Sequence, residues 1–73
     1  MASHTPSGNK THDANMQAAN NTWQAVVAGT PTQATVRAAD IAWAQTGLAS
    51  AKANGIQPGQ FISMLRELGA GGV

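Results

Sequence analysis

Glycine and proline divide this sequence into three segments, and within each of them apolar residues recur at intervals of three and four. Residues at this spacing lie on one face of an α-helix. No segment alternates β-branched with polar residues, so strands are not predicted. Gly29, Gly55 and Gly69 each follow a periodic segment, where a residue without a Cβ atom can adopt the left-handed conformation that ends a helix. The sequence therefore predicts an all-α fold of three helices, at about residues 14–28, 31–54 and 58–68.

Polar residues and prolines mark where each predicted helix begins. Asp13 is the predicted N-cap of the first helix. Thr30 is the predicted N-cap of the second, with Pro31 at the first helical position and Gln33 reaching back to the Thr30 amide. Pro58 is predicted to occupy the first position of the third helix.

The chain of 73 residues is long enough for one small domain. Residues 1–12 are polar and have no periodicity, so we expect a flexible N-terminal arm. Residues 13–69 are expected to form a single helical domain, and residues 70–73 a flexible tail. The sequence contains no cysteine, which excludes disulfides and thiolate metal sites.

Charge is scarce in this sequence. Only 10% of the residues are charged, the formal net charge is +1, and no apolar run approaches the roughly 20 residues that a membrane-spanning helix needs. A nearly neutral surface opposes self-association weakly, which favours a homo-oligomer or a larger protein assembly as the partner. Residues 1–12 also lack the apolar stretch of a signal peptide. We therefore expect a soluble protein with no membrane partner, cytoplasmic or virion-associated, that no signal peptide exports.

The predicted helix at residues 31–54 is apolar on two sides. Ile41 and Leu48 lie seven residues apart on one stripe, and Val36 and Trp43 lie seven apart on another. Gly47 costs about 1 kcal/mol relative to alanine within a helix, so two shorter helices with a kink or break near it are the alternative to one continuous helix. Small residues form two lanes where another helix could pack closely: Ala34, Ala38 and Ala42, and Ala49 and Ala53. The surplus of apolar surface indicates a second chain.

Few residues could carry chemistry. His4, His12 and Asp13 include the ligand types of zinc or nickel sites, but they fall in or beside the expected arm, so no metal or cofactor is predicted. Asp40 and Glu67 belong to different predicted helices from Asp13, which leaves no pair of acids for catalysis. The chain is therefore not expected to be an enzyme or to have a small-molecule substrate.

The segment at residues 51–68 resembles the second half of a helix-turn-helix unit. Gly55 and Ile56 lie at the turn, and Phe61 and Met64 match the inward-facing anchors of the second helix. The segment also resembles the two helices of ribbon-helix-helix repressors. The resemblance implies a small dimeric DNA-binding regulator, with DNA contacts from Lys52, Gln57, Gln60, Ser63 and Arg66. Because only Lys52 and Arg66 would contact phosphates, nucleic acid is a possible partner but not the favoured one.

The favoured interpretation is a non-enzymatic helical assembly subunit, most specifically a small virion component such as a phage capsid or tail accessory protein, or a filament component. Helical needle subunits of secretion systems are similar in outline, with a polar arm, a helix, a proline-containing turn and a long helix. The residues predicted to divide between core and subunit interface are Trp23, Val27, Val36, Ile41, Trp43 and Leu48. A further alternative is an adaptor that binds one host protein through the same apolar stripe.

Overall fold

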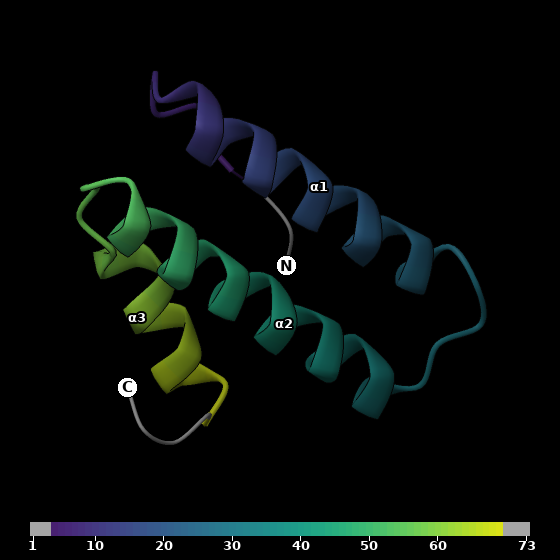
Figure 1. Cartoon of the computed structure of the whole chain (residues 1–73). Coiled ribbons are helices and arrows are strands. Elements are labelled where there is room, and N and C mark those ends of the chain that lie inside the picture. The colour runs from purple at the N-terminus through teal and green to yellow at the C-terminus, as the bar shows by residue number, and fades with distance from the viewer. Residues whose placement is uncertain (1–3, 70–73) are drawn as a thin grey trace.

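The computed structural model describes residues 4–69, and these residues form three α-helices and no strand (Figure 1). The helices are α1 (Lys10–Val27), α2 (Gln33–Ala53) and α3 (Gly59–Glu67). The predicted all-α fold of three helices is therefore confirmed. The first three residues of the predicted arm and the predicted tail at 70–73 lie outside the described residues.

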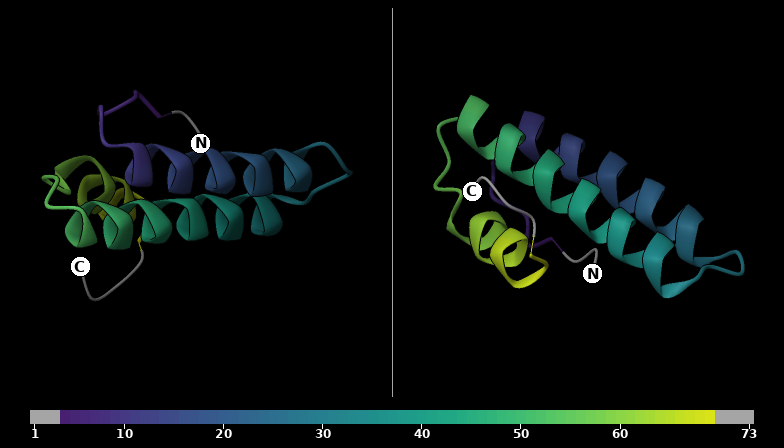
Figure 2. Two further views of the ribbon diagram at one scale, coloured as in Figure 1. Left: turned by 45° about the horizontal axis from the view of Figure 1, so that its top comes forward. Right: turned by 90° about the horizontal axis from the view of Figure 1, so that it is seen from below.

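The two long helices lie side by side and run in opposite directions, and α3 folds back against α2 (Figures 1 and 2). The short helix lies at the end of the pair where α1 begins and α2 ends, so it covers only part of one face of the α1/α2 layer (Figure 2). The resulting shape is elongated and flat, with extents of 35 × 25 × 15 Å. In the described part of the chain, none of the helices has the length and apolarity that crossing a membrane requires.

The first helix begins at Lys10, earlier than predicted, because Asn9 is its N-cap rather than Asp13. The Asn9 side chain accepts a hydrogen bond from the backbone N of His12 at 2.9 Å. Residues 10–12 thus belong to α1 and not to an arm. This corrects the predicted boundary between arm and domain, and it gives Asp13 a different role.

The second helix begins two residues later than predicted, at Gln33. Thr32, not Thr30, is the N-cap of α2, and its hydroxyl accepts a hydrogen bond from the backbone N of Thr35 at 3.2 Å. Pro31 and the expected bond from Gln33 to Thr30 are therefore not part of the helix start. In α3, Pro58 is the N-cap position and Gly59 the first helical residue.

Two of the three predicted helix-ending glycines adopt the left-handed conformation. Gly55 has a φ of 69° and Gly69 a φ of 75°. The C-cap of α1 is Ala28, in the right-handed region, and Gly29 has no positive φ. The left-handed ending predicted at Gly29 was therefore wrong.

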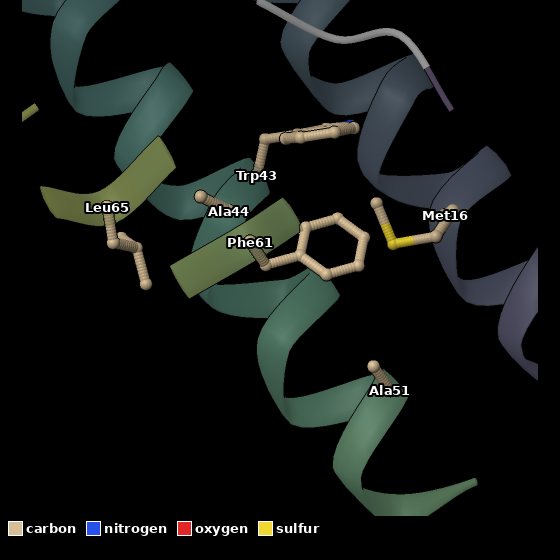
Figure 3. Packing of buried hydrophobic residues seen from close by; sticks show 6 residues of the cluster. All are labelled: Met16, Trp43, Ala44, Ala51, Phe61 and Leu65. Atoms are coloured by element: carbon tan, nitrogen blue, oxygen red, sulfur yellow. The ribbon is translucent and has the colours of Figure 1, made fainter. Parts of the chain in front are cut away.

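The core lies where the three helices meet (Figure 3). It contains one residue of α1, three of α2 and two of α3: Met16, Trp43, Ala44, Ala51, Phe61 and Leu65. The ring of Phe61 projects from α3 toward α1 and α2, and its centroid lies 5.4 Å from that of Trp43. Each helix thus contributes to one shared cluster, which fixes α3 on one face of the α1/α2 layer.

Gly47 allows this packing, and α2 is continuous through it. A Cβ atom at position 47 would lie 2.7 Å from Cζ of Phe61 and closer still to two other ring atoms. The continuous helix predicted through this position is therefore confirmed, and the alternative of two shorter helices is wrong. The glycine instead provides the space in which an aromatic ring of another helix rests against the backbone of α2.

Candidate functional site

The face of α1 and α2 that α3 leaves uncovered is hollowed by a groove of about 470 Å³. Ala38 lines this groove and lies nine positions before Gly47, which corresponds to about two and a half helical turns, so the two residues are on opposite sides of α2. Trp23 and Val26 from α1 and Ala42 from α2 also line it. None of the described lining residues is charged. The groove is therefore a neutral, mostly apolar hollow.

A second hollow continues the groove along the same pair of helices. It shares Ala19, Thr22 and Thr46 with the first and adds Ala49, among others. The uncovered face is thus hollowed along much of the α1/α2 contact. We call this face the open face. Its residues are Ala19, Thr22, Trp23, Val26, Ala38, Ala42, Thr46 and Ala49.

Two tryptophans fix the helices that form the open face. Trp43 is 2% exposed, and its indole Nε1 donates a hydrogen bond to Oδ1 of Asn20 at 2.6 Å. Trp23 is half-buried, and its Nε1 donates to Oδ1 of Asp40 at 2.5 Å. Both bonds join α1 to α2. These bonds within one chain fix the two helices that form the walls of the groove.

The structure brings together only some of the predicted interface residues. Trp23 and Trp43 line the groove, although Trp43 is also part of the core. Ile41 and Leu48 are half-buried and pack against the core cluster. The remaining two, Val27 and Val36, are half-buried and do not line the groove of the open face.

The alanine lanes were the sequence signal that located the open face best. Ala38, Ala42 and Ala49 lie along it, whereas the other two lane residues, Ala34 and Ala53, line neither hollow. The contribution of threonines was missed, because Thr22 and Thr46 are polar by type and carry no periodic apolar signal.

The residues predicted to contact DNA are all exposed, on α2, the following turn and α3: Lys52, Gln57, Gln60, Ser63 and Arg66. The two cations lie on different helices, Lys52 in the last turn of α2 and Arg66 in the last turn of α3. A third cation, Arg37, donates a hydrogen bond to the backbone oxygen of Leu68, which ties α2 to the end of α3.

A polar cluster occupies the N-terminal end of α1. The Asp13 carboxylate accepts hydrogen bonds from the backbone N and the hydroxyl of Ser7, both at 2.9 Å, and from the backbone N of Gly8 at 3.2 Å. Nε2 of His4 lies 3.1 Å from Oδ1 of Asp13. These bonds, led by that from the Ser7 backbone, lower the pKa of Asp13 from 3.8 to about 2. Residues 4–9 are thus bonded to α1.

His12 connects this cluster to α2. Its side chain is 1% exposed, and its Nδ1 lies 2.8 Å from Oγ of Ser50, which also accepts a bond from Nδ2 of Asn15 at 3.0 Å. The rings of His4 and His12 touch edge to face, with centroids 5.0 Å apart. Within residues 4–69 no group of three or more histidine, cysteine or acidic side chains could hold a metal ion.

Comparison of the chain with protein-family models, with curated proteins and with solved structures finds no match. The geometry of the described residues therefore carries the functional argument.

Proposed function

We propose that this chain is a non-enzymatic helical assembly subunit that associates with further copies of itself through the open face. The observation that carries this proposal is that α3 covers one face of the α1/α2 layer and leaves the other hollowed, apolar and without charge along its groove. Two long antiparallel helices with one bare face are half of a four-helix bundle, and a second copy supplies the other half.

The charge of the chain supports a second copy as the occupant. A charged partner would find no complementary group on the described residues that line the groove. Two identical copies repel each other little, because the net charge is only +1. The small side chains of Ala38 and Ala42 also let a neighbouring helix approach closely.

The size of the open face fits a weak, reversible contact. A face about 27 Å long and about 20 Å wide covers roughly 500 Å². Two copies would then bury on the order of 1,000 Å², the lower bound for a specific interface. Pairing of two open faces closes a dimer, so a larger structure needs a further contact between dimers. We propose that such dimers are the repeating units of a virion shell, a phage tail or a filament, located in the cytoplasm or the virion.

Sedimentation velocity over a hundredfold concentration range tests this proposal. Wild type should self-associate, and Ala42→Glu should weaken association at least tenfold because it places a charge in the groove. Ala34→Glu is the matched control, since it makes the same change at an exposed position of α2 outside the groove, and it should behave like wild type. A chain that is monomeric throughout, or association that Ala42→Glu leaves unchanged, would overturn the proposal.

The same experiment at several salt concentrations distinguishes the alternatives. Apolar self-association stays level or strengthens with salt, whereas DNA affinity falls steeply with salt. A monomer that binds duplex DNA in this salt-dependent way, and loses affinity in Lys52→Ala and Arg66→Ala, would instead be the small DNA-binding regulator. A monomer that binds neither itself nor DNA would direct the search to an adaptor role with a host protein.

A further inference from the structure

The large apolar side chains of the open face all lie at one of its ends. Trp23 bonds to Asp40 in the first half of α2, and Asn15 bonds to Ser50 near the end of α2. These bonds set the register of the two antiparallel helices. The half-buried side chains of Trp23 and Val26 therefore lie at the end of the face where α1 passes into α2, which we call the bulky end.

The other end of the open face is the second hollow, with a volume of about 530 Å³. Its lining includes Ala18, Ala19 and Ala49, and no aromatic or large aliphatic side chain is among the described lining residues. We call this the small-residue end. The open face thus has bulk at one end and room at the other.

Two copies can bring their open faces together about a two-fold axis in two ways. If the axis runs along the helices, both bulky ends lie at the same end of the dimer, so the layers are held apart there and approach closely at the other end. Straight helices then lose contact over part of their length. If the axis crosses the helices, each bulky end meets the small-residue end of the other copy, and the helices are evenly spaced along their length.

The positions of two lysines favour the same arrangement. Lys10 is the first residue of α1 and Lys52 lies in the last turn of α2, so both exposed cations are at the small-residue end. Copies in the same orientation would gather both pairs of lysines at one end of the dimer. Asp13 is also at this end, but its carboxylate is bonded to the segment before α1. Reversed copies place one pair of lysines at each end, which lowers the repulsion between them.

Resting on the proposed function, we propose that the second copy binds with its helices reversed, so that Trp23 and Val26 of each copy enter the small-residue end of the other. Each α2 then packs antiparallel against the α2 of the other copy. Ala42 is close to the two-fold axis, because it lies midway between Thr35 and Ser50, the first and last residues of α2 that line the hollows. The connections between α1 and α2 lie at opposite ends of the dimer.

A distance between two labels tests this orientation without touching the interface. The chain has no cysteine, so Thr30→Cys provides a single site for a spin label, in the exposed connection between α1 and α2. Pulsed electron resonance on the dimer should give a separation of about 30 Å, whereas copies in the same orientation would give about 10–20 Å. Sedimentation velocity checks that the labelled chain associates as wild type does.

Disulfide cross-linking tests the pairing of the helices. Ala42→Cys should form a covalent dimer on mild oxidation, because a disulfide requires Cα atoms within about 7 Å and the two copies of position 42 meet near the axis. Ala34→Cys is the control at an exposed position outside both hollows, and it should stay uncrosslinked. Copies in the same orientation would instead place α1 on the other α2, so chains with Thr22→Cys would cross-link to chains with Ala42→Cys.

The outcomes separate this inference from the proposed function. A chain that is monomeric at every concentration overturns both. A dimer with a short Thr30 distance, or with cross-links between positions 22 and 42 in place of those between two copies of position 42, overturns only the reversed orientation.

Discussion

At position 47 the absence of a side chain decides how closely α2 and α3 can approach each other. The Phe61 ring occupies the space that a Cβ atom would need, and it also contacts Trp43 in the core. An aromatic ring locked between helices cannot shift without opening the cluster around it. The packing of α3 on α2 therefore requires a glycine at position 47.

Gly47→Ala should therefore lower the free energy of unfolding by about 2 kcal/mol, because overpacking costs up to about 3 kcal/mol and alanine gains only about 1 kcal/mol within a helix. Urea denaturation at one protein concentration measures this. Gly59→Ala is the control, since a Cβ atom there meets nothing within 4 Å, and it should cost nothing. A Gly47→Ala variant as stable as wild type would contradict the packing described here.

At the scale of the helix, the choice of cap determines where each element begins. Both Thr30 and Thr32 are residues that favour N-caps, and the sequence pattern selected the first because Pro31 follows it. In the structure the N-cap is Thr32, whose hydroxyl accepts a hydrogen bond from the backbone N of Thr35. Similarly, Asn9 replaces Asp13 at the start of α1.

Alanine substitution separates these two candidate caps of α2. Thr32→Ala should lower the free energy of unfolding by about 1 kcal/mol, because it leaves a backbone N–H of the first turn without its acceptor. Thr30→Ala should have little effect, since Thr30 is exposed and lies outside the helix. Thermal unfolding of the two variants side by side measures the difference, and a larger loss in Thr30→Ala would mean that the predicted start was correct.

The helices were predictable from sequence because periodicity is a local signal. Features that depend on contacts between residues far apart in the sequence were not predictable. The sequence left a break at Gly47 open as an alternative, because the Phe61 ring that explains the glycine lies on another helix. The alanine lanes indicated where the open face lies, but the bonds between Asp13 and the segment before it depend on the backbone path of residues 4–9, which no periodicity specifies.

At the scale of the whole molecule, stability comes from one cluster and from the ties around it. The three helices share the core, Arg37 joins α2 to the residue after α3, and the Asp13 bonds hold the segment before α1. The last of these ties depends on the charge of a carboxylate. Acid should therefore loosen the folded chain at this end.

The pH dependence follows from the lowered pKa of Asp13. Since this pKa is about 2 in the folded chain and ordinarily 3.8, the stability that Asp13 contributes is fully present above pH 3.8 and is lost as the pH falls toward 2. Asp13→Asn should be less stable than wild type at neutral pH, and its stability should fall less between pH 4 and pH 2. Urea denaturation at stepped pH measures both. Parallel pH curves for the two proteins would show that Asp13 does not contribute in this way.

The flat arrangement of neighbours also bears on how fast the chain folds. The helix pairs with backbone contacts are α1 with α2 and α2 with α3, which are consecutive along the chain. Connections between consecutive helices close small loops, and chains built this way fold in microseconds to milliseconds. Encounters between copies at micromolar concentrations are slower than this. Each copy would therefore fold before it meets another, so assembly would join chains that are already folded.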